Sequence, residues 1–177
     1  MNPPERFDTP RLILRKPRVD DAPAIFEAYA QDPEVTRHLT WRPHRDLQET
    51  YAIIGRIIDS WTVGETYSFA ITLKHAEALV GMLAMHMEGS AIGLGYVLAR
   101  THWGNGYMTE AVRAVVDWAL NQPDIFRVFA TCGVENLASA RVMEKAGMVR
   151  EGLLRRHIVH PNVSDEPVDS FIYAIVR

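Results

Sequence analysis

The chain has 177 residues, of which 47% are hydrophobic and 23% are charged, and these proportions exclude a disordered, collagen-like or low-complexity protein. Nineteen Lys and Arg residues against twenty-two Asp and Glu residues give a formal net charge of -3, which argues against a dedicated nucleic-acid binder. A chain of this length is expected to form one domain over residues 1–177, as a monomer or a homodimer.

A single cysteine, Cys132, cannot form an intramolecular disulfide, and this favours a reducing, cytoplasmic setting. The longest nearly apolar stretch, residues 78–85, is too short for a membrane helix, and the first residues have no apolar signal core. We therefore expect a cytoplasmic protein that has neither a membrane nor a nucleic acid as a partner.

The first half of the chain predicts a strand at 11–15, a helix from Asp20 to about Gln31, a second helix at 46–61, and an irregular segment at 32–45. Strands follow at about 67–73, 79–87 and 92–98, and their nearly continuous apolar residues are typical of a sheet covered on both faces. Gly93 and Gly95 lie inside the third of these strands, where glycine indicates a bulge or a close approach by another group.

The second half predicts a long helix at about 105–121, a strand at 127–134, and a short helix at 137–146 that ends at Gly147. Two last segments, 149–158 and 168–176, predict an antiparallel pair of strands. This order of elements indicates an α/β or α+β layered domain with a mixed sheet.

The most informative segment is residues 96–111, where a strand ends, a loop with two glycines follows, and a long helix begins. Residues Gly104 to Tyr107 would expose N–H groups at the positive end of the helix dipole, which is a site for a phosphate or a pyrophosphate. The segment lacks the Lys of a Walker loop, and Thr109 replaces the third glycine of the dinucleotide fingerprint. An ordinary strand-to-helix turn remains the alternative at this point.

Several blocks together resemble the GCN5-related N-acetyltransferase (GNAT) superfamily. They are Thr9–Arg15, Trp103-Gly-Asn-Gly-Tyr107 followed by Glu110-Ala111, Cys132-Gly-Val-Glu-Asn136 with Ser139 and Glu144–Met148, and Arg150–Arg155. Their order is similar to the branch that acetylates ribosomal-protein N-termini (RimJ/RimL-like). The resemblance implies the GNAT fold, with a mixed, mostly antiparallel central sheet, a splayed strand, and helices on both faces.

The resemblance also implies acetyl-CoA as co-substrate and no metal. It would place the pantetheine arm along Tyr96, Val97, Leu98 and Ala99, the pyrophosphate on the amides of Gly104, Asn105, Gly106 and Tyr107, and Asn136 beside the pantetheine. Thr101 stands where most of the superfamily has Gln or Arg, and Arg100 is the candidate that replaces this charge near the phosphates.

The implied reaction moves an acetyl group from the thioester to a primary amine, either a protein N-terminus or a small amine, by direct attack in a ternary complex. A backbone N–H near Leu98 would stabilise the oxyanion. Many members protonate the thiolate with a tyrosine, but Met143 holds that position here, so Ser139 is the candidate acid or thiolate stabiliser. The alternative is that Ser139 caps or lines the helix start.

The proton acceptor is less defined, because the two positions at which the branch places one are Gly93 and Ile158. Glu88, Glu135, His86, His157 or a water chain are the substitutes. These two vacant positions also keep open a non-catalytic acyl-CoA binding or sensing module as an alternative to an enzyme.

Other reactive residues favour structural roles. Cys132 is expected to be a buried thiol, and His157 and His160 are expected on opposite faces of a strand, which makes a poor metal pair. His38 and His44 have no carboxylate at ligand spacing. Of the tryptophans considered, Trp41 is the one expected to line an acceptor pocket, while Trp61 and Trp103 are expected to pack.

Overall fold

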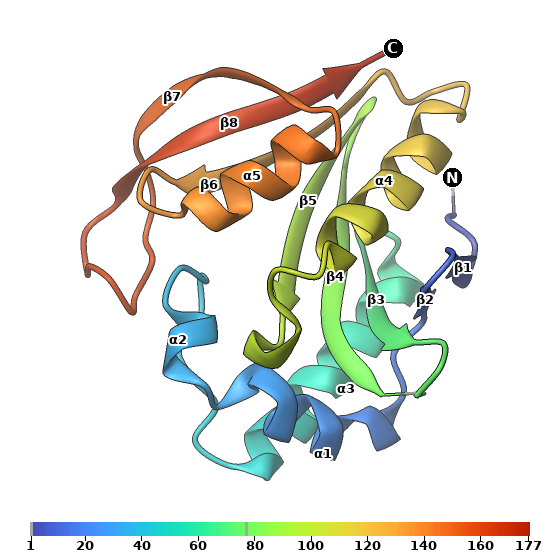
Figure 1. The fold of residues 1–177 in the computed structure, drawn as a ribbon, viewed down its shortest axis with the longest axis vertical. Coiled ribbons are helices and arrows are strands. Elements are labelled where there is room, and N and C mark those ends of the chain that lie inside the picture. Colours follow the sequence, from blue (N-terminus) through green and yellow to red (C-terminus); the bar gives the residue numbers. More distant parts are fainter. Residues whose placement is uncertain (1, 77) are drawn as a thin grey trace.

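A mixed eight-stranded sheet runs through the computed structural model, which describes residues 2–76 and 78–177 (Figure 1). The strand order is β1-β2-β3-β4-β5-β6-β8-β7, and β5 with β6 is the parallel pair among otherwise antiparallel neighbours. The strands are β1 (Arg6–Asp8), β2 (Leu12–Arg15), β3 (Thr66–Leu73), β4 (Leu79–Glu88), β5 (Ala91–Leu98), β6 (Arg127–Gly133), β7 (Val149–Ile158) and β8 (Val168–Val176). The expected mixed, mostly antiparallel sheet is confirmed.

Helices cover both faces of this sheet, as expected (Figure 1). One cluster of buried side chains lies under α4 and α5, and a second lies between the sheet, α1 and α3. The helices are α1 (Ala22–Ile25), which continues into a π-helical turn (Phe26–Ala30), α2 (Pro33–Thr36), α3 (Leu47–Val63), α4 (Tyr107–Leu120) and α5 (Leu137–Lys145), with 3-10 turns at Val19–Asp21 and Arg100–His102. No helix within the described ranges is long and apolar enough to span a bilayer.

The ends of α3 follow from local chemistry. The Asp46 side chain accepts a hydrogen bond from the Glu49 N–H at 2.9 Å, and this satisfies one of the free donors of the first turn. At the other end Gly64 adopts a left-handed φ of 82°, a conformation that glycine adopts without steric cost. The helix therefore runs two residues beyond the predicted end at Trp61.

Two short elements differ from the sequence prediction. Strand β1 was not predicted, because three residues are too few to show a strand period, yet it pairs with β2 from Arg6↔Arg15 to Asp8↔Ile13. Helix α2 lies in the segment expected to be irregular. Asp32 caps it by accepting from the Glu34 N–H at 2.9 Å, and Pro33 occupies the first turn, where its missing N–H costs nothing.

Strand β5 separates from β6 halfway along its length. Their pairing runs from Ala91↔Arg127 to Leu94↔Ala130, whereas β5 continues to Leu98 and β6 pairs with β8 along its whole length, from Arg127↔Val176 to Gly133↔Ser170. The sheet therefore opens between the two strands, and the splayed strand that was expected is confirmed. Of the two alternatives predicted for Gly93 and Gly95, a bulge is absent from the pair with β4, because that ladder has an unbroken register from Glu88↔Ala91 to Gly81↔Leu98. A close approach is present at Gly93, where a Cβ atom would lie 3.1 Å from Cζ of Phe129.

Gly81 keeps β4 and β5 close together beside this opening. A Cβ atom at Gly81 would lie 2.3 Å from the Val97 carbonyl oxygen, a separation that real Cβ atoms do not reach. Any larger side chain would therefore push Val97 and its neighbours out of the ladder.

Candidate functional site

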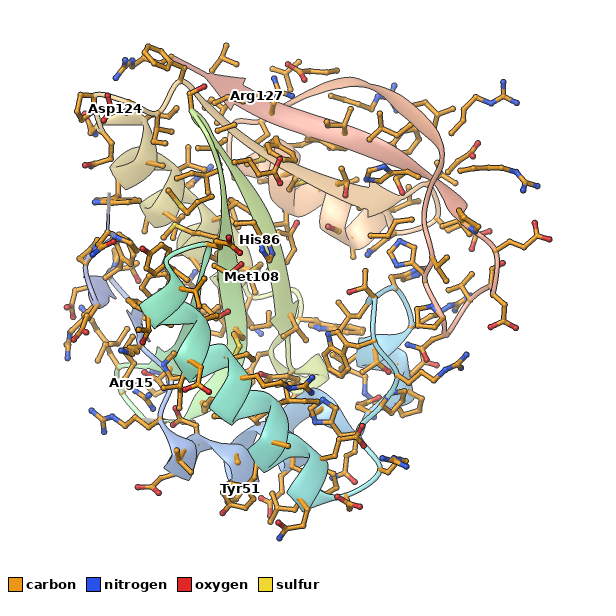
Figure 2. All side chains as sticks on the ribbon, turned by 180° about the vertical axis from the view of Figure 1, so that it is seen from behind. Arg15, Tyr51, His86, Met108, Asp124 and Arg127 are labelled. Carbon is orange, nitrogen blue, oxygen red and sulfur yellow. The ribbon has the colours of Figure 1, made fainter. Side chains whose placement is uncertain are left out.

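A cleft of about 880 Å³ occupies the opening between β5 and β6. Its walls come from β4, β5, β6 and β7, from α3, and from the segment between α2 and α3. Figure 2, which views the molecule from the α3 side, shows His86 next to the paired strands β4 and β5. The cleft thus joins the splayed strand to side chains from distant parts of the chain.

The loop before α4 presents backbone amides beyond the end of β5. Gly104 and Gly106 both have a φ of 76°, and Gly106 is the residue that precedes the first turn of α4. Across residues 2–76 and 78–177, the N–H groups of Gly104, Asn105 and Gly106 have no protein acceptor, so they are free to bind an anion. The predicted strand–loop–helix arrangement is present here.

Glu110 anchors this loop to the N-terminal segment. Its carboxylate accepts from Thr9 Oγ1 at 2.6 Å, from the Arg11 N–H at 2.8 Å and from Arg11 Nε at 2.6 Å. Arg11 also donates to the Asn105 carbonyl at 3.0 Å, and its guanidinium lies 4.6 Å from the centre of the Tyr107 ring. Burial opposes ionisation of Glu110, but the hydrogen bonds from Thr9 and Arg11 outweigh it and lower the pKa of the carboxyl. Sequence reasoning missed this anchor.

The end of β5 is held from both sides. Leu98 accepts a hydrogen bond at its carbonyl from Trp103 Nε1 at 2.8 Å, and the Ala99 N–H donates to the Val80 carbonyl at 2.8 Å. Trp103 was expected to pack, but it is 47% exposed, and its indole N–H holds the end of the strand through the hydrogen bond to Leu98.

Ser139 faces the splayed strand. Its hydroxyl lies 2.8 Å from the Tyr96 hydroxyl, while its backbone N–H donates to Asn136 Oδ1 at 3.1 Å. Asn136 is therefore the cap of α5, and the Ser139 hydroxyl is not used for capping. Burial raises the pKa of Tyr96 far above its ordinary value, so the phenol is neutral at physiological pH. Met143 is fully buried in the core.

Cys132 is buried, as expected, on the same wall of the cleft. Burial raises the pKa of its thiol to about 11, and the neighbouring Ser139 opposes that shift only in part. The thiol is therefore protonated at neutral pH and is a poor nucleophile.

The far side of the cleft is closed by a contact between two loops. Asn162, in the loop between β7 and β8, donates from Nδ2 to the Thr36 carbonyl at 2.8 Å and to the Trp41 carbonyl at 2.7 Å. Trp41 lines the cleft with its ring 5.0 Å from that of His44. His160 is buried in the same wall, and neither of its ring nitrogens has a partner among the described residues.

The predicted candidates for proton transfer fall into two groups. Glu88, His86 and His157 line the cleft, together with the vacant positions Gly93 and Ile158, whereas Glu135 lies outside the cleft lining.

Two further predictions concern charge and metal binding. Arg100 is exposed and forms an ion pair with Asp32, with Nε 3.2 Å from the carboxylate oxygen, so it points toward α2 in this structure. Three or more potential metal ligands do not gather anywhere in the described ranges.

Comparisons with known proteins agree with this geometry. The family model of the acetyltransferase (GNAT) domain matches residues 11–149. An N-acetyltransferase of Bacillus licheniformis named p20, itself uncharacterised, is 28% identical over 98% of this chain and 97% of its own length. The alanine N-acetyltransferase of ribosomal protein uS5 from Escherichia coli is 26% identical over 89% and 84% of the two chains. A solved structure of the ribosomal L7/L12 α-N-protein acetyltransferase RimL with coenzyme A has a TM-score of 0.86 at 22% identity, over 97% of this chain and 98% of the other.

Proposed function

Because the chain belongs to the GNAT acetyltransferase family and is an N-acetyltransferase that uses acetyl-CoA, we propose that the β5–β6 opening and the loop before α4 bind this co-substrate. The observation that carries the proposal is the pair of left-handed glycines, Gly104 and Gly106, which leave the loop amides without protein acceptors among the described residues. Those amides and the N-terminus of α4 suit a diphosphate. A non-catalytic acyl-CoA binding module is not favoured.

The splayed strand suits the pantetheine arm. Beyond Leu94, β5 no longer pairs with β6, and Tyr96 and Val97 line the cleft in extended form, whereas Leu98 and Ala99 lie outside its lining. An extended amide-containing chain can add to such an edge through backbone hydrogen bonds. Asn136 lies across the opening, and its side-chain NH2 group remains available because its oxygen caps α5.

We assign Ser139 as the group that stabilises or protonates the departing thiolate, and a main-chain N–H of the part of β5 that lines the cleft as the oxyanion donor. Acetyl-CoA supplies the activated acyl group, and the chain supplies orientation and protons. A neutral Tyr96 phenol 2.8 Å from the Ser139 hydroxyl can return a proton to it after each turnover.

The acceptor is a primary amine, and a ribosomal or other protein N-terminus is the first class to test. This proposal rests on the relatives that acetylate ribosomal proteins uS5 and L7/L12. Small amines are the second class. We further propose that residues 1–177 act as one acetyltransferase domain in the cytoplasm, as a monomer or homodimer, without a nucleic acid or a membrane as partner.

The direct test is release of free thiol from acetyl-CoA in the presence of peptides, polyamines and aminoglycosides. We expect release with at least one amine, and a peptide with a free N-terminus should be a better acceptor than the same peptide with a blocked one. Binding of CoA without release with any amine at any pH would instead establish a binding module.

A further inference from the structure

Strand β4 carries two ionisable side chains into the cleft at the level of the two glycines of β5. His86 pairs with Gly93 and Glu88 with Ala91 in the β4–β5 ladder. His86 and Glu88 are two residues apart on one strand, so their side chains share a face, and both line the cleft together with Gly93 and Gly95. Figure 2 shows His86 beside these strands.

The Glu88 carboxylate lies in contact with the place where a side chain at position 93 would begin. A Cβ atom at Gly93 would be 3.4 Å from Glu88 Oε1 and 3.1 Å from Cζ of Phe129. A Cβ atom at Gly95 would be 3.6 Å from His86 Nε2. The missing side chains of β5 therefore leave room that β4 fills with a carboxylate and an imidazole.

We propose that Glu88 is the proton acceptor for the incoming amine, supplied from β4 to the site left vacant at Gly93. The inference rests on the proposed function. An ammonium ion has no free lone pair, so it must lose one proton before it attacks. Glu88 takes that proton and passes it to solvent, to which its side chain is exposed. The new bond joins nitrogen to the acyl carbon, and the carbon–sulfur bond breaks. Glu88, which has released the first proton to solvent, accepts the second nitrogen proton. The thiolate takes a proton from the Ser139 hydroxyl, which regains one from solvent through Tyr96, so that one proton is released overall.

The surroundings of Glu88 support this role. His86 holds its ring against Thr66, with Nδ1 3.1 Å from Oγ1. Partial burial lowers the pKa of His86, although the Glu88 charge opposes the shift, so the imidazole is neutral at pH 7. The other cationic or imidazole side chains that line the cleft are those of Arg56, His38, His44, His157 and His160, while β6 contributes the Phe129 ring, 5.7 Å from the guanidinium carbon of Arg127.

The first test is Glu88→Gln, with Glu65→Gln as the matched control at an exposed carboxylate outside the cleft lining. At pH 7 we expect the acceptor kcat/KM to fall about 100-fold in Glu88→Gln, while the affinity for CoA is unchanged. The deficit should shrink as the pH rises toward 9, because the amine is then already neutral. A variant with wild-type rate and an unchanged pH profile would overturn the assignment.

A transplanted carboxylate gives the second test. Glu88→Ala with Gly93→Glu moves the group to β5, where Phe129 is the remaining tight neighbour. We expect the acceptor kcat/KM of this double variant to be at least about tenfold higher than that of Glu88→Ala alone. If Glu88 only stabilised the fold, a glutamate at position 93 would not restore activity. A folded double variant as slow as Glu88→Ala would count against the proposal.

Two measurements do not need turnover. Glu88→Gln should lower the pKa of His86 in an NMR titration, because the neighbouring negative charge is lost. Calorimetry with spermidine and with an unblocked peptide, each added to the CoA-bound protein, should show about tenfold weaker binding in Glu88→Gln. Equal binding by both proteins would refute the role of Glu88 even if no acceptor were turned over, whereas thiol release by the wild type tests the proposed function separately.

Discussion

The proposed coenzyme side and the proposed acceptor side of the cleft consist of different groups. The coenzyme side uses main chain: the free amides of Gly104 to Gly106 and the unpaired edge of β5. The acceptor side uses side chains from β4, α3, β7 and two loops. A main-chain site depends on glycine at fixed positions, whereas a side-chain site can receive the same chemical group from another strand.

The largest effect is expected where a side chain is forced onto the main-chain side. Gly106→Asp places a carboxylate against the proposed diphosphate site and a Cβ atom on a residue with a φ of 76°. We expect CoA affinity to fall by more than about 100-fold, measured by calorimetry. Gly55→Asp, at a helical glycine with no atom within 4 Å of its Cβ position, is the control that should bind CoA normally. Normal CoA binding by a folded Gly106→Asp would remove the loop from the site.

Ser139→Ala separates chemistry from binding at the boundary between the two sides. The thiolate loses its hydroxyl partner, so we expect kcat to fall about 10- to 100-fold while the CoA dissociation constant stays within about twofold. Tyr96→Phe, which keeps the ring but removes the hydroxyl 2.8 Å from Ser139, should give a smaller decrease in kcat. Equal rates for Ser139→Ala and wild type would assign the serine to packing alone.

Asn162→Ala should affect only the acceptor side. The substitution removes the two hydrogen bonds that hold the Thr36 and Trp41 carbonyls. We expect the KM for the acceptor to rise about three- to tenfold, with no change in the KM for acetyl-CoA. Ser164→Ala, in the same loop, is the matched control. A parallel rise in both KM values would show that the two sides are not independent.

The smallest effect concerns the anchor beneath the coenzyme loop. The pKa of Glu110 is lowered in the folded chain from its ordinary 4.5, so its ionised form contributes stability above that pH, and the contribution is lost as the pH falls through the lower folded pKa. Glu110→Gln should cost about 1 kcal/mol of unfolding free energy at pH 7 and progressively less below about pH 4. Urea unfolding at both pH values measures the difference; an equal loss at both would mean that charge is irrelevant there.

The sequence predicts the main-chain side better than the side-chain side. Glycine at 104 and 106 followed by an amphipathic helix is a local pattern, and the structure places the loop and α4 where that pattern indicates. The strands β7 and β8 also match their predicted ranges, because each is long enough to show its pattern. Local patterns of this kind need no knowledge of what lies across the sheet.

Contacts between distant segments could not be predicted in this way. The meeting of Glu88 with Gly93 depends on the register of β4 and β5, and the meeting of Asn162 with Trp41 depends on how two loops fold together. Gly81 carries no local signal either, because its importance comes from the Val97 carbonyl of the neighbouring strand. The importance of such residues becomes visible only when the tertiary structure shows which distant residues they contact.

The anchor at Glu110 has a consequence for biosynthesis. Thr9 and Glu110 meet although they are 101 positions apart along the chain, so the N-terminal residues leave the ribosome long before their partner has been made. The contacts of Glu110 with Thr9 and Arg11, which hold the loop before α4 against the N-terminal segment, cannot form until α4 has been synthesised. Translation must therefore pass well beyond the middle of the message before the growing polypeptide can form the proposed coenzyme-binding loop in its final position.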